Sequence, residues 1–141
     1  MPNILKIQAS IVDDFSFLPA WDERYAYLIE LGQKNPPLSE EHRTEDNLVR
    51  GCQSQVWLQR ECRQGTVYLQ ADSDSLIVKG LAALLLQVFS GQPAEAILRA
   101  DLHFFEEIGL DKHLSSQRAN GLLAMVDQIK SYAAQCVGEN Q

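Results

Sequence analysis

Cysteine is scarce in this chain: only Cys52, Cys62 and Cys136 occur among 141 residues, and no two of them form a CxxC pair. A secreted domain held by disulfides carries more cysteines, usually an even number, and a structural zinc site places its ligands at short, recurring spacings. The three histidines show no zinc-type spacing with one another or with the cysteines. The pattern therefore favours free thiols in a reducing compartment, and it predicts no metal site.

Positive charge and long apolar runs are also in short supply. Twelve Lys and Arg against nineteen Asp and Glu give a net charge of -7, which attracts neither a phosphate backbone nor an anionic membrane surface. The most apolar stretch, residues 81–89, falls far short of the ~20 residues that a membrane span needs. The N-terminus lacks the basic segment and apolar run of a signal peptide. We therefore expect a cytoplasmic protein that binds neither nucleic acid nor membranes.

The composition is that of a packed protein, with 45% hydrophobic and 22% charged residues. A chain of this length is long enough to bury a core, so we expect residues 1–141 to form a single domain. Gly-rich phosphate loops and GxSxG elbows are absent from the sequence. Nucleotide and serine-hydrolase chemistry therefore lose their usual sequence support.

Apolar residues recur at helical spacing in six segments. The predicted helices cover 4–15, 21–32, 76–89, 93–99, 102–108 and 116–133. The third is apolar nearly all round, which is typical of a central buried helix. Its predicted cap is Ser73 or Asp74, and that of the last helix is Ser115 or Ser116.

Between the second and third helices the pattern changes to that of strands. Residues 53–62 and 67–71 alternate, imperfectly in the first case, around a Gln64-Gly65 turn, and predict an antiparallel hairpin. Residues 47–49 can add a short third strand, and the charged stretch before them predicts a solvated loop. The predicted fold class is α+β, with a small antiparallel sheet packed against helices.

Cys52 is the best candidate for chemistry because it lies in a connection before a strand, where scaffolds often hold reactive groups. Gly51 permits unusual backbone angles, and Arg50 offers a positive charge that favours thiolate over thiol. The competing interpretation is an inert, partly buried cysteine. Cys62 and Cys136 fall on apolar faces and are predicted to be small core side chains. Residues 54–62, if extended, span about 26 Å, so Cys52 and Cys62 cannot form a disulfide.

The segment at residues 51–57, GCQSQVW, resembles the acceptor-cysteine motif of the SufE family, the sulfur-acceptor proteins of iron–sulfur cluster assembly. Further blocks match in the family's order: WDERY at 21–25, LIELG at 28–32, DSD at 72–74, IVKGL at 77–81, and His113-Leu114, Ser116, Arg118 and Gly121-Leu122. The related CsdE branch usually carries a charged or amide pair where this chain has Gln53-Ser54-Gln55, so the SufE branch is favoured.

This resemblance implies a fold shared with iron–sulfur scaffold proteins and a role for Cys52 as persulfide carrier. Cys52 would take sulfur from a SufS-type cysteine desulfurase, activate that enzyme, and supply a downstream iron–sulfur scaffold complex. The chain would then be a carrier rather than an enzyme, without a cofactor of its own, because the pyridoxal phosphate belongs to the desulfurase. Asp74 and Arg118 match family positions near the docking face, and the docking surface is expected to include Asp72 as well. Cys62 and Cys136 have no counterpart in the motif.

Other functions remain open on the sequence alone. An iron–sulfur scaffold shares the fold but needs several converging ligands, a CsdE-like acceptor would serve another desulfurase pathway, and a thiol peroxidase needs only one reactive cysteine. A homodimer is also compatible with the sequence, which identifies no surface for it. Gly51 and the polar run 53–55 further suggest that Cys52 is tucked inward in the free protein and swings outward when the desulfurase binds.

Overall fold

The computed structural model describes residues 3–52 and 54–139 and confirms the predicted α+β class. The first half contains α1 (Ile4–Ser16), α2 (Trp21–Lys34), the short 3-10 helices η1 (Glu40–His42) and η2 (Glu45–Asn47), and the strands β1 (Val56–Arg63) and β2 (Thr66–Ser73). The second half contains α3 (Leu76–Phe89), β3 (Gln92–Pro93), α4 (Ala94–Arg99), α5 (Phe104–Glu107), α6 (Leu110–His113) and α7 (Ser116–Glu139). Gln53, part of the predicted strand and of the cysteine motif, lies outside the described residues, as do Met1 and Pro2 at the N-terminus.

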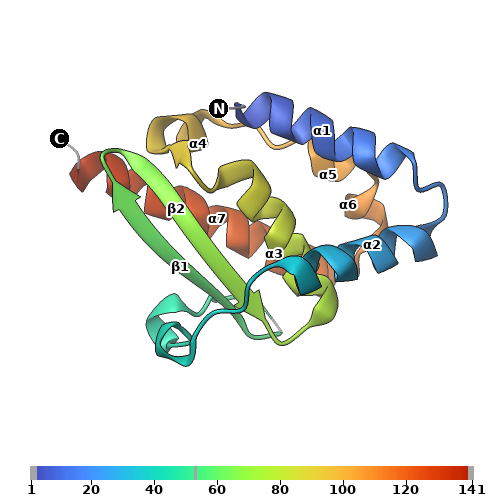
Figure 1. Ribbon diagram of the computed structural model, residues 1–141, viewed down its shortest axis with the longest axis horizontal. Helices are drawn as coiled ribbons and strands as arrows, with labels where there is room; N and C mark the ends of the chain where they lie inside the picture. Colours follow the sequence, from blue (N-terminus) through green and yellow to red (C-terminus); the bar gives the residue numbers. More distant parts are fainter. Residues whose placement is uncertain (1–2, 53, 140–141) are drawn as a thin grey trace.

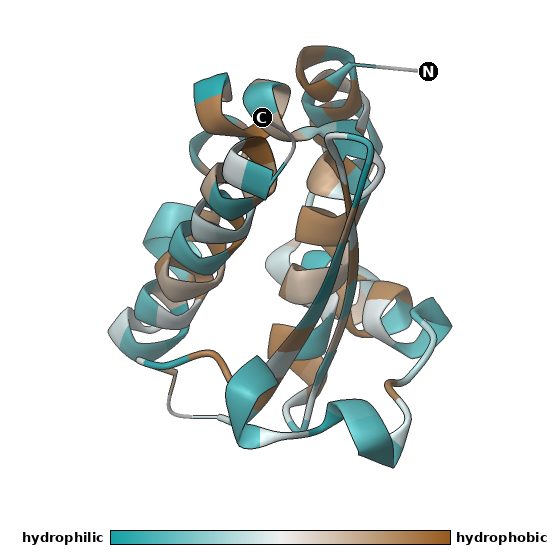
Figure 2. Cartoon of the chain, turned by 90° about the vertical axis from the view of Figure 1, so that its left-hand side faces the viewer, coloured by the Kyte–Doolittle hydropathy of each residue, from teal (hydrophilic) through white to brown (hydrophobic). Residues whose placement is uncertain are grey.

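Helix α3 is the centre of the structure, as its all-round apolar pattern predicts. It contacts α1, α2, α7 and β2, and residues 80–85 within it are all buried. In Figure 1, α2 lies on one side of α3 and the hairpin on the other, and in Figure 2 hydrophobic colour follows α3 behind the hairpin. The core therefore lies between the helices and one face of the sheet.

Helix α2 crosses α3 at very close range. A Cβ atom added at Gly80 would lie 2.1 Å from the backbone oxygen of Leu28, and one added at Gly32 would lie 2.8 Å from the Gly80 nitrogen. Both glycines allow the two backbones to touch, because any larger residue would force the helices apart. This contact fixes the position of the first turns of α3. It thereby also positions the Asp72–Ser75 segment, which lies beside the loop that carries Cys52.

The hairpin follows the predicted turn. Val56 pairs with Ser73 and Arg63 with Thr66, and Gln64 and Gly65 adopt positive φ angles of 51° and 79°. Two such residues in sequence form the tight turn that matches the twist of antiparallel strands. The inward face of the hairpin carries the buried residues Val56, Leu58, Val67, Leu69 and Ala71.

The predicted third strand is wrong. Leu48 makes only an isolated bridge with Trp57, because the chain turns away at Arg50 and Gly51 after a single hydrogen bond from the Val49 N–H to the Val56 carbonyl. The third strand is instead β3, which pairs with the start of β2. The sheet order is therefore β1-β2-β3.

Other local predictions are also corrected. Ser75, rather than Ser73 or Asp74, caps α3 by accepting from the Val78 N–H at 3.4 Å. The stretch before the sheet is not wholly solvated, since Leu38 is buried there, and α6 was missed because four residues carry too little periodicity. The predicted Ser115 cap of α7 is confirmed, because its hydroxyl accepts from the Arg118 N–H.

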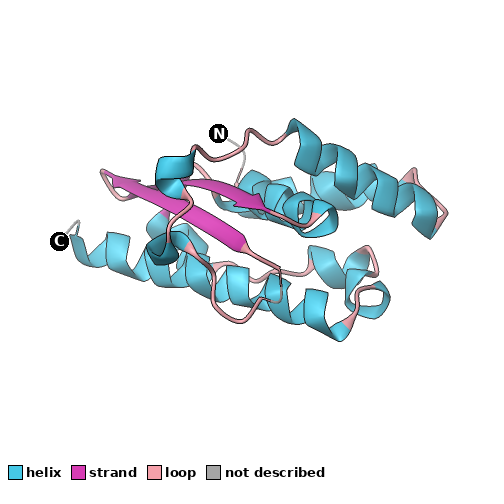
Figure 3. Cartoon of the chain, turned by 90° about the horizontal axis from the view of Figure 1, so that it is seen from below, coloured by secondary structure: helices cyan, strands magenta, loops and turns pink. Residues whose placement is uncertain are grey.

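Helix α7 lies alongside the hairpin. Figure 3 shows it running beside the strands, and it contacts α3, α4 and β2. Its buried face includes Gly121, Leu122, Met125 and Ile129. Because α7 is long, it reaches both the loop before β1 and the far end of the hairpin, and each of these places holds a cysteine.

Candidate functional site

Cys52 lies half-buried in the turn between Val49 and β1, and it is the only free cysteine among residues 3–52 and 54–139. Its Sγ donates a hydrogen bond to the Gly121 carbonyl oxygen on α7, at 3.6 Å. Gly51, just before it, has a φ of 90°, a conformation that glycine adopts without strain. The thiol is therefore turned inward, onto the first turns of α7.

An open cavity of about 350 Å³ lies in front of this thiol. Its lining includes Cys52, Ser54, Ser75, Ser115, Arg118 and Gly121. The lining thus combines small polar residues with one arginine, and part of it comes from the start of α7. The arrangement suits a thiol that receives a group from outside rather than one enclosed in a core.

Gly121 is the residue of α7 that lies against the Cys52 sulfur, and we call this position the seat of the thiol. A Cβ atom added there would lie 3.4 Å from Cys52 Sγ and 3.9 Å from Cys52 Cβ. A Cβ atom would thus still fit at ordinary contact distance, whereas a larger side chain would reach the position of the sulfur. The sequence showed Gly121 only as a weak point in a helical stripe and as part of a matching block, so its role beside the thiol was missed.

Both ends of the cysteine loop are held by hydrogen bonds. On one side the Val49 N–H bonds the Val56 carbonyl at 2.8 Å. On the other, Asp74 accepts from the Gln55 N–H at 3.0 Å and its own N–H donates to the Gln55 carbonyl at 3.2 Å. Since neither anchor involves Cys52, the loop can move the thiol without breaking the sheet.

Burial raises the pKa of the Cys52 thiol above its ordinary value. A thiolate loses its hydration in a half-buried position, and this desolvation disfavours the charged form. The expected lowering by Arg50 is therefore wrong, because the Arg50 side chain is exposed and burial dominates. The inward position therefore disfavours the thiolate, which is the form that reacts with electrophiles.

The three predicted docking residues lie in different environments. Arg118 lines the Cys52 cavity, and Asp74 is exposed beside it, where its carboxylate anchors Gln55. Asp72, in contrast, is only 2% exposed. The structure thus brings Arg118 and Asp74 close to Cys52 and places the Asp72 carboxylate beneath the surface.

The Asp72 carboxylate is fully satisfied within the fold. It accepts from the Arg43 guanidinium at 2.6 Å, the Lys79 ammonium lies 3.3 Å away, and the backbone N–H groups of Leu38 and Ser73 donate to it. Burial alone would raise the pKa of Asp72, but these hydrogen bonds and the Lys79 charge outweigh it and lower the pKa. Asp72 therefore ties the loop before β1 to the start of α3.

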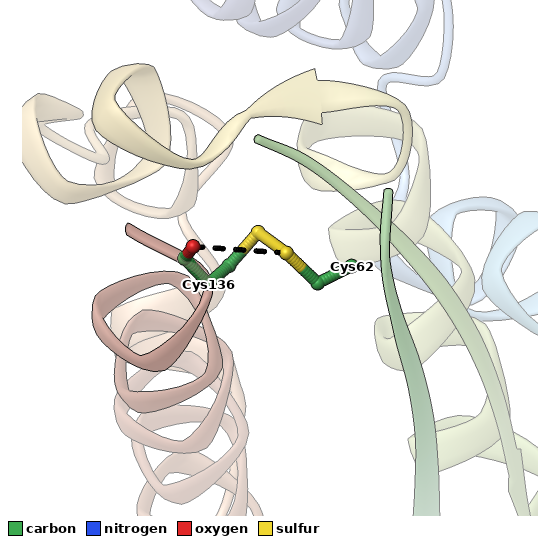
Figure 4. Close-up of a disulfide and its surroundings, with 2 residues drawn as sticks. All are labelled: Cys62 and Cys136. Carbon is green, nitrogen blue, oxygen red and sulfur yellow. Dashed lines mark hydrogen bonds between the residues drawn. A yellow bond between two sulfur atoms is a disulfide. The ribbon is translucent and has the colours of Figure 1, made fainter. Parts of the chain in front are cut away.

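Cys62 and Cys136 form a disulfide, so the prediction of free thiols at these positions is wrong. The two residues are 74 positions apart, and their Cα atoms lie 5.6 Å from each other (Figure 4). The apolar placement of both was correct in part, because Cys136 is 1% exposed. The two cysteines lie on elements that become neighbours only in the folded chain. Spacing along the sequence does not reveal such a pairing.

Within residues 3–52 and 54–139, no three His, Cys, Asp or Glu side chains gather as metal ligands do. None of the helices in the same ranges combines the length and apolar character needed to cross a bilayer. Neither observation alters the description of the Cys52 site.

The fold and the site together define an α+β protein that presents one cysteine on an anchored loop beside a cavity. A family model described as "Fe-S metabolism associated domain", SufE, matches residues 9–133, so the chain belongs to the SufE family.

Two relatives agree with this assignment, and a solved structure shares the fold. The chain is 48% identical to an uncharacterized SufE-like protein of Rhizobium meliloti (strain 1021) over 128 residues, covering 87% of this chain and 91% of that protein. It is 47% identical to an uncharacterized SufE-like protein of Rhizobium etli, covering 87% and 86%. The solution structure of a hypothetical protein from Thermus thermophilus shares the fold, with a TM-score of 0.76, 24% identity, and 94% and 96% coverage.

Replacing Gly121 tests the seat of the thiol. In Gly121→Val, the γ-methyl groups take the space of Cys52 Sγ and push the thiol into solvent, whereas Gly121→Ala adds a Cβ at ordinary contact distance. We expect the valine variant to be alkylated by iodoacetamide about tenfold faster at neutral pH, as a mostly closed thiol becomes open. The midpoint of its pH–rate curve should also fall towards that of an ordinary cysteine, because the desolvation is removed.

The alanine variant serves as the matched control and should keep nearly the wild-type rate and midpoint. Both variants should show the circular dichroism of the wild type. Equal alkylation rates and equal midpoints in wild type and Gly121→Val would mean that the thiol does not occupy this seat.

Proposed function

We propose that Cys52 accepts sulfur from a SufS-type cysteine desulfurase and carries it as a persulfide into iron–sulfur cluster assembly. The observation that carries this proposal is a free thiol, turned inward on an anchored loop, at the mouth of an open cavity. Membership of the SufE family supports a role in iron–sulfur metabolism. A carrier needs one thiol that is protected between partners and reachable within a complex, and Cys52 meets both needs.

The transfer is a displacement at sulfur. The desulfurase presents a cysteine persulfide, and the Cys52 thiolate attacks the outer sulfur of that group. A bond forms between Cys52 Sγ and the outer sulfur, the partner's sulfur–sulfur bond breaks, and the partner's cysteine leaves as a thiolate. The proton of Cys52 goes to solvent before the attack, so charge and electrons balance and no external oxidant is needed.

Docking must therefore both expose and deprotonate Cys52. In the free protein the thiol is bound to the Gly121 carbonyl and burial raises its pKa. Outward movement gives up one weak hydrogen bond of a thiol and restores hydration to the thiolate. A preference of ~1.4 kcal/mol for the inward position leaves about one molecule in ten open, and a partner that binds only the open loop removes that restriction.

The pyridoxal phosphate in this scheme belongs to the desulfurase, and this chain contributes no cofactor. It acts as carrier and activator, in the cytoplasm, and hands its sulfur to a downstream iron–sulfur scaffold complex. The desulfurase could also belong to a CsdE-like pathway, which the choice of partner in the assay would reveal. An iron–sulfur scaffold function needs several ligands, and two of the three cysteines are engaged with each other.

Intact-mass analysis after incubation with a SufS-type desulfurase and free cysteine tests the proposal. Wild-type protein should gain the mass of one or more sulfur atoms, reversibly with reductant, and Cys52→Ser should gain none. Cys62→Ser/Cys136→Ser is the matched control and should still load sulfur on Cys52, because neither residue lies at the cavity.

Loading of Cys52→Ser to the same extent would refute the assignment of Cys52. An iron-dependent absorbance band after reconstitution would instead favour the scaffold function. Peroxide consumption without any desulfurase would favour a thiol peroxidase.

Charge reversal tests the proposed docking surface at Asp74 and Arg118. Arg118→Glu and Asp74→Lys should weaken association with the desulfurase, more strongly at low salt, because exposed charges steer encounter and are screened by ions. Asp74→Asn separates charge from structure, since its side-chain oxygen still accepts from the Gln55 N–H. Because Asp72 is buried, it contributes to docking indirectly, by holding in place the segment that carries Asp74.

The control charge reversal is Glu95→Lys on α4. The carbonyl of Ala100, at the C-terminal end of α4, accepts a hydrogen bond from Lys130 in the C-terminal half of α7. The control reversal should leave binding unchanged. Titration by isothermal calorimetry at two salt concentrations measures each variant. Wild-type affinity for both Arg118→Glu and Asp74→Lys at low salt would remove these residues from the interface.

A further inference from the structure

The Cys62–Cys136 pair joins β1 to α7 at the other end of the helix from the Cys52 loop. Cys62 lies near the end of β1, opposite Val67 of β2, and Cys136 lies in the C-terminal part of α7. From Gly121 to Cys136 the helix rises about 22 Å. The pair therefore cannot share in the chemistry of Cys52, and its function has to be sought in the contact between hairpin and helix.

A second contact accompanies the pair. The Arg60 guanidinium lies over the Tyr132 ring, 4.4 Å from its centre. Arg60 is two residues before Cys62 on the same face of β1, and Tyr132 is one helical turn before Cys136. The disulfide and the cation–π contact are thus two neighbouring links between β1 and α7. The cation–π contact also explains why Arg60 interrupts the apolar alternation of the strand.

Small molecules have a path to the sulfurs. An open cavity of about 350 Å³ is lined by Cys62 and Cys136 together with Asn47, Gln59, Tyr132 and Gln135. Cys62 is half-buried, whereas Cys136 is 1% exposed. Of the two residues that line this cavity, Cys62 is therefore the one more exposed to a thiol or disulfide reagent.

The reduced form also fits the same backbone. The Cys136 carbonyl oxygen lies 3.7 Å from Cys62 Sγ, along the dashed line in Figure 4. When the bond is reduced, the Cys62 thiol has this acceptor in place and Cys136 returns to its apolar surroundings, where a thiol packs as a small hydrophobic group. Both redox states of the pair are therefore compatible with its surroundings.

We propose that Cys62 and Cys136 are a redox-active site that reacts with small-molecule disulfides and thiols and clamps α7 to the hairpin when oxidised. A reachable disulfide in a reducing compartment is typically redox-sensing rather than permanent. Its closure links residues 74 positions apart, so it restricts the unfolded chain and stabilises the fold. This site is independent of sulfur transfer by Cys52.

The oxidation proceeds by two exchanges. The Cys62 thiolate attacks one sulfur of a small disulfide, and the first small thiolate leaves. The Cys136 thiolate then attacks Cys62 Sγ of the mixed disulfide, the sulfur–sulfur bond to the small molecule breaks, and a second thiolate leaves. The protein loses two electrons and two protons, and one small disulfide becomes two thiols. Reduction by a small dithiol reverses each step.

Equilibration of the purified protein in buffers of reduced and oxidised glutathione tests the proposal, with the desulfurase absent. Samples are quenched with acid, alkylated in denaturant and weighed intact, and the melting temperature is measured in parallel. We expect one alkylated cysteine in oxidising buffer and three in reducing buffer, with a transition at an intermediate glutathione ratio. The oxidised form should melt roughly 10 °C higher.

The comparison uses one chain in two redox states, so it does not depend on a variant that folds. Cys62→Ser/Cys136→Ser is the control for effects of the buffers and should melt at the same temperature in both. A pair that stays oxidised at every ratio, or stays reduced at every ratio, would overturn the redox response. Equal melting temperatures of the two wild-type forms would overturn the clamp.

Discussion

The packing of α7 along the hairpin is the constraint on which both sulfur sites depend. Near one end of this helix the Cys52 thiol lies against Gly121 and bonds its carbonyl oxygen. Near the other end Cys136 meets Cys62 of β1. Between these points the buried face of the helix packs against α3 and β2. The packing of the core therefore determines where the Cys52 thiol lies.

The candidate site combines anchored surroundings with a half-buried thiol on the loop between the anchors. Asp74 holds Gln55, and buried Asp72 ties Leu38 and Arg43 to the start of α3. Because folding lowers the pKa of Asp72, its ionised carboxylate stabilises the folded state. This stabilisation is complete above the ordinary pKa of an unfolded aspartate and is lost as the pH falls through the lower folded value. At neutral pH the hydrogen bonds and ion pairs of the Asp72 carboxylate are therefore at full strength.

Much of the fold could be predicted from local patterns, because long helices and tight turns are determined by neighbouring residues. The all-round apolar pattern of α3 and the Gln64-Gly65 turn were both confirmed. The failures involve distant partners: the pairing of β3 with β2, the Cys62–Cys136 bond and the seat at Gly121. Periodicity carries no information on which face meets which, and the effect of Arg50 on Cys52 was misjudged because burial cannot be read from neighbours in sequence.

Amide hydrogen exchange across residues 50–52 and 54–56 tests the central claim that Cys52 is held inward and released by its partner. The protein is measured alone and with a SufS-type desulfurase whose active cysteine has been replaced, so that binding occurs without transfer. We expect faster exchange in this loop on binding, while the Val56–Arg63 strand keeps its protection. Unchanged or stronger protection of the loop in the complex, together with fast alkylation of Cys52 in the free protein, would contradict it.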